Sequence, residues 1–149
     1  MDVRQSIEIA APPERIWPFL VEPDHVLEWY ETLRTFRYAE GRPRGPGVRV
    51  YAEEKGTGML MKLHFEATEW VENRVVALHM ISGTGVKGYD QRWLLEPSPT
   101  GSRFTFSEHV ELPYGPLGRL IGGVAKRSSE GHVKEMLATL KAMAEARPG

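Results

Sequence analysis

The stretch 113–146 restricts the fold most, because it has the pattern of one long helix whereas the chain before it alternates like a sheet. Apolar residues recur three or four positions apart at Leu117, Ile121 and Val124, as on the buried side of an amphipathic helix. A second apolar set begins at Val133, about two and a half turns later at roughly 3.6 residues per turn, so the stripe changes side. We therefore expect one long helix whose two halves bury different surfaces.

Glycine occupies positions in the first half of this helix where the second half carries apolar side chains. Gly118 and Gly122 lie on the line that Met136 and Leu140 occupy further along. Because glycine inside a helix costs about 0.5–1 kcal/mol relative to alanine, these positions need an explanation. They mark either a kink near the start of the helix or room for a bound molecule.

Composition limits the class of protein. A chain of 149 residues has the size of a single domain, and we expect one domain over 1–149. The net charge of −1 gives no basic field for nucleic acid, and the absence of cysteine excludes disulfides and thiolate chemistry. No apolar run is long enough for a signal peptide or a membrane span. We expect a cytoplasmic domain without a nucleic-acid partner.

The chain before the long helix predicts strands and two short helices. Residues 3–9 alternate as a first strand, Pro13 suits the first turn of a helix through Leu20, and Pro23 opens a second short helix that carries Trp29. Six further strands follow, and matching their apolar faces registers the hairpins. A two-residue loop at 56–57 sets Val50 opposite Leu63 and Ala52 opposite Met61; later hairpins, one turning at 72–73, set Ala67 opposite Leu78, Leu78 beside Gln91, and Gln91 opposite Glu108.

The order strand, two short helices, six strands and long helix is that of the helix-grip fold. The chain resembles the START-like (SRPBCC) superfamily, which includes the birch-pollen allergen proteins and the polyketide cyclase/dehydrase-like proteins, in residues 6–17, Trp29, 100–106 and 115–118. The resemblance implies an α+β fold in which a curved seven-stranded antiparallel sheet wraps around the C-terminal helix. It also implies a cavity for an apolar or amphipathic small molecule. Members include carriers, receptors and cyclases, so the shared fold does not fix a reaction.

Motifs for cofactors and metals are lacking. The sequence has no P-loop, no dinucleotide-binding glycine motif and no HExxH pair. The strand register places Glu66, His79, Asp90 and His109 in one row on the outer face of the sheet. We interpret this row as a cross-strand charge ladder, which is far more common than a metal site. We therefore expect neither a metal nor a cofactor.

The inner face carries one polar pair among aromatic residues, Gln91 and Glu108. Burial would raise the pKa of such a carboxyl. The pair is either structural, through a hydrogen bond or a bulge that turns Glu108 outward, or it forms the polar end of an apolar pocket. The ligand-binding residues expected from this face and from the helix are Trp29, Met61, Phe65, Leu78, Tyr89, Gln91, Trp93, Phe106, Glu108, Leu117, Gly118, Ile121 and Gly122.

Two functions from different classes fit these observations. The first is a protein that binds an apolar or amphipathic ligand, such as a lipid, a polyketide or an aromatic compound, between sheet and helix. The second is a cyclase/dehydratase-type enzyme in which Glu108 moves a proton. A weaker third alternative is an adaptor that contacts another protein. The sequence does not separate the first two, and it indicates neither the ligand nor the oligomeric state.

Overall fold

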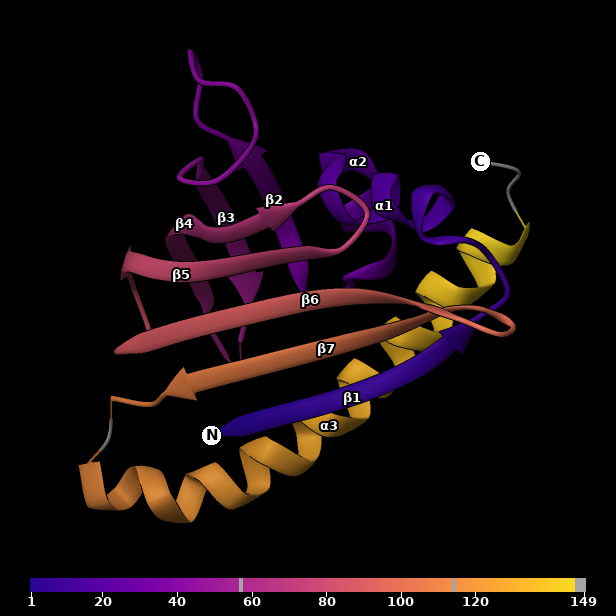
Figure 1. The fold of residues 1–149 in the computed structure, drawn as a ribbon. Coiled ribbons are helices and arrows are strands. Elements are labelled where there is room, and N and C mark those ends of the chain that lie inside the picture. Colours follow the sequence, from indigo (N-terminus) through magenta and orange to yellow (C-terminus); the bar gives the residue numbers. More distant parts are fainter. Residues whose placement is uncertain (57, 114, 147–149) are drawn as a thin grey trace.

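The computed structural model describes residues 1–56, 58–113 and 115–146, with the backbone alone for 116 and 118–120. A first strand and two short helices precede six strands and one long helix (Figure 1). The elements are β1 (Asp2–Ile9), α1 (Pro13–Val21), α2 (Pro23–Trp29), β2 (Leu33–Tyr38), β3 (Arg49–Lys55), β4 (Leu60–Val71), β5 (Val75–Gly83), β6 (Gly88–Ser98), β7 (Gly101–Glu111) and α3 (Gly115–Ala146). This order confirms the helix-grip architecture.

All seven strands form one antiparallel sheet in the order β1-β7-β6-β5-β4-β3-β2. The sheet curls, and α3 runs beside β1 with its last turns near α1 (Figure 1). The core lies between the concave face of the sheet and the helices. Its aromatic centre includes Trp29, whose indole Nε1 donates to the Phe19 carbonyl oxygen at 2.7 Å, and Trp93, which packs edge-on against it.

The predicted register of the inner face is confirmed over β4 to β7. Ala67 pairs with Leu78, Leu78 with Gln91, and Gln91 with Glu108. The turn between β4 and β5 is longer than predicted, because Val71 pairs with Val75. A bulge after Ala67 removes the extra residue from the pairing and restores the predicted register.

The predicted register between β3 and β4 is wrong by two residues. Val50 pairs with Phe65, and Ala52 pairs with Leu63. The cause is a longer loop, in which the Gly56 backbone N–H donates to the Met59 carbonyl oxygen at 2.8 Å. A slip of two residues keeps every side chain on its face, so the apolar pattern fits both registers. In the observed register Glu54, not Ala52, pairs with Met61.

Helix α3 has two different halves, as predicted, but the first half buries no stripe of its own. Met136 and Leu140 are buried, whereas Leu117, Ile121 and Val124 are 60%, 43% and 74% exposed. The expectation of two buried stripes is therefore wrong, because no described element covers the first half, whose turns extend away from the strands in Figure 1. A Cβ at Gly122 would meet no atom within 4 Å, so this glycine borders open space as predicted. Gly118 lies outside the residues whose surroundings are described.

No helix in the described ranges is long and apolar enough to cross a membrane.

Candidate functional site

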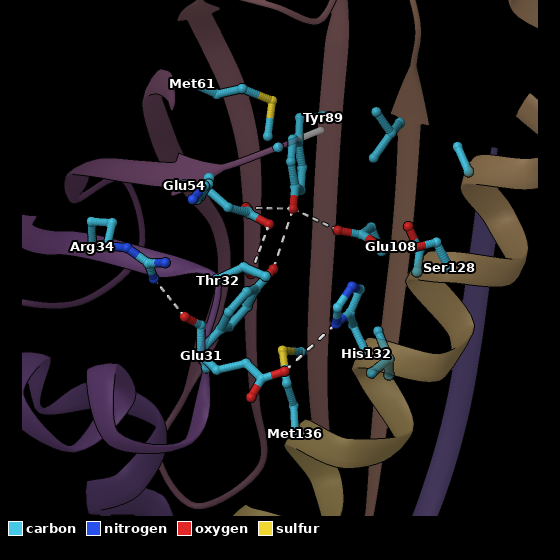
Figure 2. Close-up of a pocket in the computed structure, with 17 residues that line it drawn as sticks. Glu31, Thr32, Arg34, Glu54, Met61, Tyr89, Glu108, Ser128, His132 and Met136 are labelled. Atoms are coloured by element: carbon cyan, nitrogen blue, oxygen red, sulfur yellow. Dashed lines mark hydrogen bonds and ion pairs between the residues drawn. The ribbon is translucent and has the colours of Figure 1, made fainter. Parts of the chain in front are cut away.

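A cavity of about 520 Å³ opens between the sheet and α3 (Figure 2). Its walls come from five strands or strand ends and from the middle of α3, so segments far apart in the sequence meet there. The lining residues are Tyr30, Glu31, Thr32 and Arg34 before and in β2, Glu54, Lys55 and Gly56 at the end of β3, Met61, Tyr89, Glu108 and Val110 on β4, β6 and β7, and Ala125, Ser128, Ser129, His132, Val133 and Met136 on α3.

The inner end of this cavity is a polar network centred on the Tyr89 hydroxyl, in which Tyr30, Tyr89 and Glu108 are buried and Thr32 and Glu54 are half-buried. This oxygen lies 2.8 Å from Oε1 of Glu54 and 2.5 Å from Oε1 of Glu108. The Tyr30 hydroxyl lies 3.2 Å from the same oxygen, and Thr32 Oγ1 donates to Oε2 of Glu54 at 3.2 Å. Figure 2 shows the two carboxyl groups approaching Tyr89 from opposite sides. We call Glu54, Tyr89 and Glu108 the acid–phenol triad.

Gln91 lies beneath the triad and has a fixed orientation. The indole Nε1 of Trp93, which can only donate, contacts Oε1 of Gln91 at 2.9 Å. The amide nitrogen of Gln91 therefore points to the phenols, and donates to Tyr30 at 2.5 Å and to Tyr89 at 2.9 Å. Its contact with Oε1 of Glu108, at 3.4 Å, is long. The predicted pair of Gln91 and Glu108 is therefore present, but each of the two side chains lies closer to the Tyr89 hydroxyl than to the other.

The acid–phenol triad has too few hydrogens for two ionised carboxylates. A phenol has one hydroxyl hydrogen, so Tyr89 cannot donate to both carboxyl groups at once. Two carboxylates that share one hydroxyl lie roughly 5 Å apart, where their repulsion is about 3 kcal/mol at an effective dielectric constant near 20. A proton on one carboxyl removes this repulsion and supplies the missing hydrogen. Glu54 and Glu108 therefore form a pair that favours holding one proton.

The pKa values follow the same physical causes. Burial, with the negative charge of Glu108, raises the pKa of Glu54 to about 7. Burial also raises the pKa of Glu108, against the opposing hydrogen bonds from Tyr89 and Gln91. Burial raises the pKa of the Tyr30 and Tyr89 phenols well above their usual value, so both are neutral. The site thus contains an acidic group that exchanges its proton near neutral pH.

The rim of the cavity carries exposed charged groups. Nδ1 of His132 lies 3.5 Å from Oε1 of Glu31, and Nη1 of Arg34 donates to the carbonyl oxygen of Glu31 at 2.6 Å. Glu31, His132 and Glu135 offer ligand atoms within 4.8 Å of one another, which is close enough for a metal ion to contact all three. All three are exposed, and such clusters are common on surfaces without a metal.

The structure brings only some of the predicted ligand-binding residues to this cavity. Met61, Tyr89 and Glu108 line it, and Gln91 supports it from below. Five others pack in the core and do not line it: Trp29, Phe65, Leu78, Trp93 and Phe106. Leu117 and Ile121 are exposed on α3, outside the cavity lining, and Gly122 borders open space near them. For Gly118 only the backbone is described, so its position relative to the cavity stays a prediction.

Sequence reasoning missed Glu54, Tyr30 and His132. Glu54 had a signal, because alternation from Val50 and Ala52 along β3 continues inward to it. Tyr30 directly follows α2, and its burial depends on how that helix packs against the sheet. His132 lines the cavity although it is exposed, and the apolar pattern of the helix gives no signal for it.

The row on the outer face of the sheet has the predicted register. Glu66 pairs with His79, His79 with Asp90, and Asp90 with His109. Nδ1 of His79 contacts Oδ1 of Asp90 at 2.5 Å, whereas Nδ1 of His109 contacts Asp2 on β1 at 2.6 Å. Among the described residues, the charge contact within the row is therefore that between His79 and Asp90, because His109 takes its partner from the neighbouring edge strand.

The family described as polyketide cyclase/dehydrase and lipid transport matches residues 1–145, and the chain belongs to this family. The match confirms the resemblance to the START-like superfamily. No curated protein matches the chain in sequence.

Solved structures share the fold at low sequence identity. Protein TTHA0849 from Thermus thermophilus is 19% identical, with 98% of each chain covered and a TM-score of 0.81. A START superfamily protein from Mycobacterium smegmatis is 17% identical, with 97% of each chain covered and a TM-score of 0.74. The di-domain aromatase/cyclase StfQ from the steffimycin biosynthetic pathway is 14% identical over 98% of this chain and 51% of that chain, with a TM-score of 0.77. These likenesses show the fold alone.

Proposed function

We propose that this protein binds an apolar or amphipathic small molecule in the cavity between sheet and α3, with the polar end of the molecule on the acid–phenol triad. The observation that carries the proposal is a cavity of about 520 Å³ that ends on a largely buried polar network. Ligand pockets typically measure about 300–1,000 Å³ and combine apolar walls with a few placed polar groups. The apolar walls here include Met61, Val133 and Met136.

Filling the cavity from α3 tests this proposal. Ala125 lines the cavity, whereas Ala138 lies on the same helix, is exposed and does not line it. We expect Ala125→Leu to weaken binding of the neutral dye N-phenyl-1-naphthylamine about fivefold, because the added side chain takes space from the dye. Ala138→Leu should leave the affinity unchanged. Fluorescence titration measures both, and equal affinities in the two variants would remove the cavity as the binding site.

A second candidate function is acid–base catalysis on a polyketide-like substrate. It is favoured by the two carboxyl groups that meet one phenol at the end of the cavity, where burial raises the pKa of Glu54 to about 7. A general acid or base works best when its pKa lies near the operating pH. In this case Glu54 or Glu108 exchanges a proton with the substrate, and Tyr89 holds the hydrogen between them. Glu108→Gln separates the two functions. A catalytic role predicts that a poly-β-keto thioester still binds but is no longer converted, whereas a binding role predicts weaker affinity for ligands with a polar end.

A further inference from the structure

We propose that the polar end of the cavity selects ligands that carry a positively charged nitrogen, such as a protonated amine, over neutral and carboxylate ligands. This inference rests on the proposed binding function and names the class of ligand. It starts from the two carboxyl groups of the acid–phenol triad, which reach the cavity without a basic partner. Among the described residues, neither Glu54 nor Glu108 forms an ion pair.

Within the described ranges, the basic groups that line the cavity form no ion pair with Glu54 or Glu108. Arg34 donates to the backbone carbonyl oxygens of Glu31 and Leu33, and His132 pairs with Glu31 at the rim. Lys55 lines the cavity but forms no ion pair within the described part of the chain. The N-terminal ammonium donates to the Val110 carbonyl oxygen at 2.9 Å. It forms no ion pair with Glu108 among the described residues, although its charge partly offsets the effect of burial on the pKa of that carboxyl. The inner end of the cavity is therefore rich in hydrogen-bond acceptors, and no ion pair within the described part of the chain neutralises the negative charge of its two carboxyl groups.

The triad also lacks hydrogen-bond donors. An ionised carboxylate accepts about four hydrogen bonds. Among the described residues, Thr32 and Tyr89 are placed to donate to Glu54, and Tyr89 and, at 3.4 Å, Gln91 are placed to donate to Glu108. The single hydroxyl hydrogen of Tyr89 serves one of the two carboxyl groups at a time. An ammonium group brings both a charge and up to three N–H donors, and it would form charge-assisted bonds with both carboxylates. It can thus replace the proton that the pair holds in the empty cavity.

The exchange of the shared proton for an ammonium group needs no further reactant. The protonated carboxyl releases its proton to the buffer, the alkylammonium keeps all its hydrogens, and two carboxylates then face one cation. A neutral alcohol offers one donor and no charge. A carboxylate ligand adds a third negative group, which a buried site of this kind opposes. The expected order of affinity is therefore amine, alcohol, carboxylate.

Three probes with the same chain, octylamine, 1-octanol and octanoate, test the selection near neutral pH. Displacement of N-phenyl-1-naphthylamine should show octylamine bound at least about tenfold more tightly than 1-octanol, with octanoate weakest. Isothermal titration in buffers of different ionisation enthalpy should show proton release with octylamine, and its affinity should rise between about pH 6 and pH 8. Octylamine itself stays protonated over this range, because alkylamines have pKa values near that of lysine, about 10.4.

Two substitutions and one control test whether the preference for octylamine depends on the triad. Glu54→Gln and Glu108→Gln should each reduce the preference for octylamine over 1-octanol to about threefold or less and abolish proton release. Glu53→Gln, on the neighbouring position of β3 and outside the cavity lining, should keep the full preference. If either triad variant fails to fold, the other variant and the pH dependence of octylamine binding to the unmodified protein still test whether the triad selects cations.

The outcomes separate the two proposals. If 1-octanol displaces the dye and octylamine binds no more tightly, the proposal that the triad selects cations is wrong, whereas the proposal of a binding cavity is retained. The selection is also wrong if octylamine is preferred but Glu54→Gln and Glu108→Gln retain the preference, because the amine then binds elsewhere. If none of the probes displaces the dye and the dye itself does not bind, the proposed binding function fails.

Discussion

Glu54→Gln is expected to raise the free energy of unfolding by about 1–3 kcal/mol near pH 8 and to have little effect near pH 5. The reason is the raised pKa of Glu54, about 7 in the folded protein against an ordinary value of 4.5. The folded state keeps the proton over this window while the unfolded state has lost it, so folding stability falls as the pH rises from about 4.5 to 7. Glutamine does not ionise and therefore avoids this loss.

Urea denaturation at several pH values measures the effect as the difference between variant and unmodified protein. The difference is needed because protonation of exposed carboxyls with lowered pKa values, such as Asp2 and Glu69, lowers the free energy of unfolding in acid. This contribution is the same in every variant. Glu53→Gln is the control, since the hydrogen bond from Thr35 lowers the pKa of Glu53 and this variant should gain nothing at high pH. Parallel curves for Glu54→Gln and the unmodified protein would show that Glu54 is not desolvated.

Gly101→Ala is expected to lower the free energy of unfolding by about 2–4 kcal/mol. Gly101 begins β7 with φ at +141°, which disfavours any side chain. A Cβ there would lie 2.5 Å from the Ile9 carbonyl oxygen and 2.6 Å from the Ala11 backbone nitrogen. These are backbone atoms at the end of β1, held in place by Ser102, whose hydroxyl donates to the Ala11 carbonyl oxygen at 2.7 Å. They cannot move aside as a flexible side chain would.

Gly122→Ala provides a matched control for this substitution. The same methyl group at Gly122 meets no atom within 4 Å, and alanine favours the helix by about 0.5–1 kcal/mol. Chemical denaturation should therefore show opposite signs for the two glycine-to-alanine changes. A loss at Gly101 no larger than the change at Gly122 would contradict the close approach of β7 to the end of β1.

The sequence was sufficient for the fold and for two of the three members of the acid–phenol triad, Tyr89 and Glu108. Alternation together with the turn expected between 97 and 102 placed Gln91 opposite Glu108, and the observed register confirms this pairing. The register of β3 could not be settled in the same way, because a shift by two residues leaves every side chain on its face. The length of the 56–59 loop decides between the registers and so pairs Glu54 with Met61.

Tertiary packing accounts for the other differences between the predictions from sequence and the structure. An apolar stripe at Leu117, Ile121 and Val124 predicts burial, but burial requires an opposing element, and the described chain provides none. Tyr30 enters the polar network because α2 ends directly above the sheet, and local sequence does not determine that position. Trp93 and Phe106 face the concave side as expected, yet they fill the core instead of lining the cavity.

The central claim is that a small molecule occupies the cavity between sheet and α3, and methionine methyl NMR tests it most directly. The chain has six methionines, of which Met61 and Met136 line the cavity. Met143 and the exposed Met59 do not. Titration with 1-octanol should shift the methyl signals of Met61 and Met136 in a saturable manner and leave that of Met143 unchanged. Unshifted signals from both cavity methionines at saturating 1-octanol, or shifts confined to Met59, would contradict a ligand in this cavity.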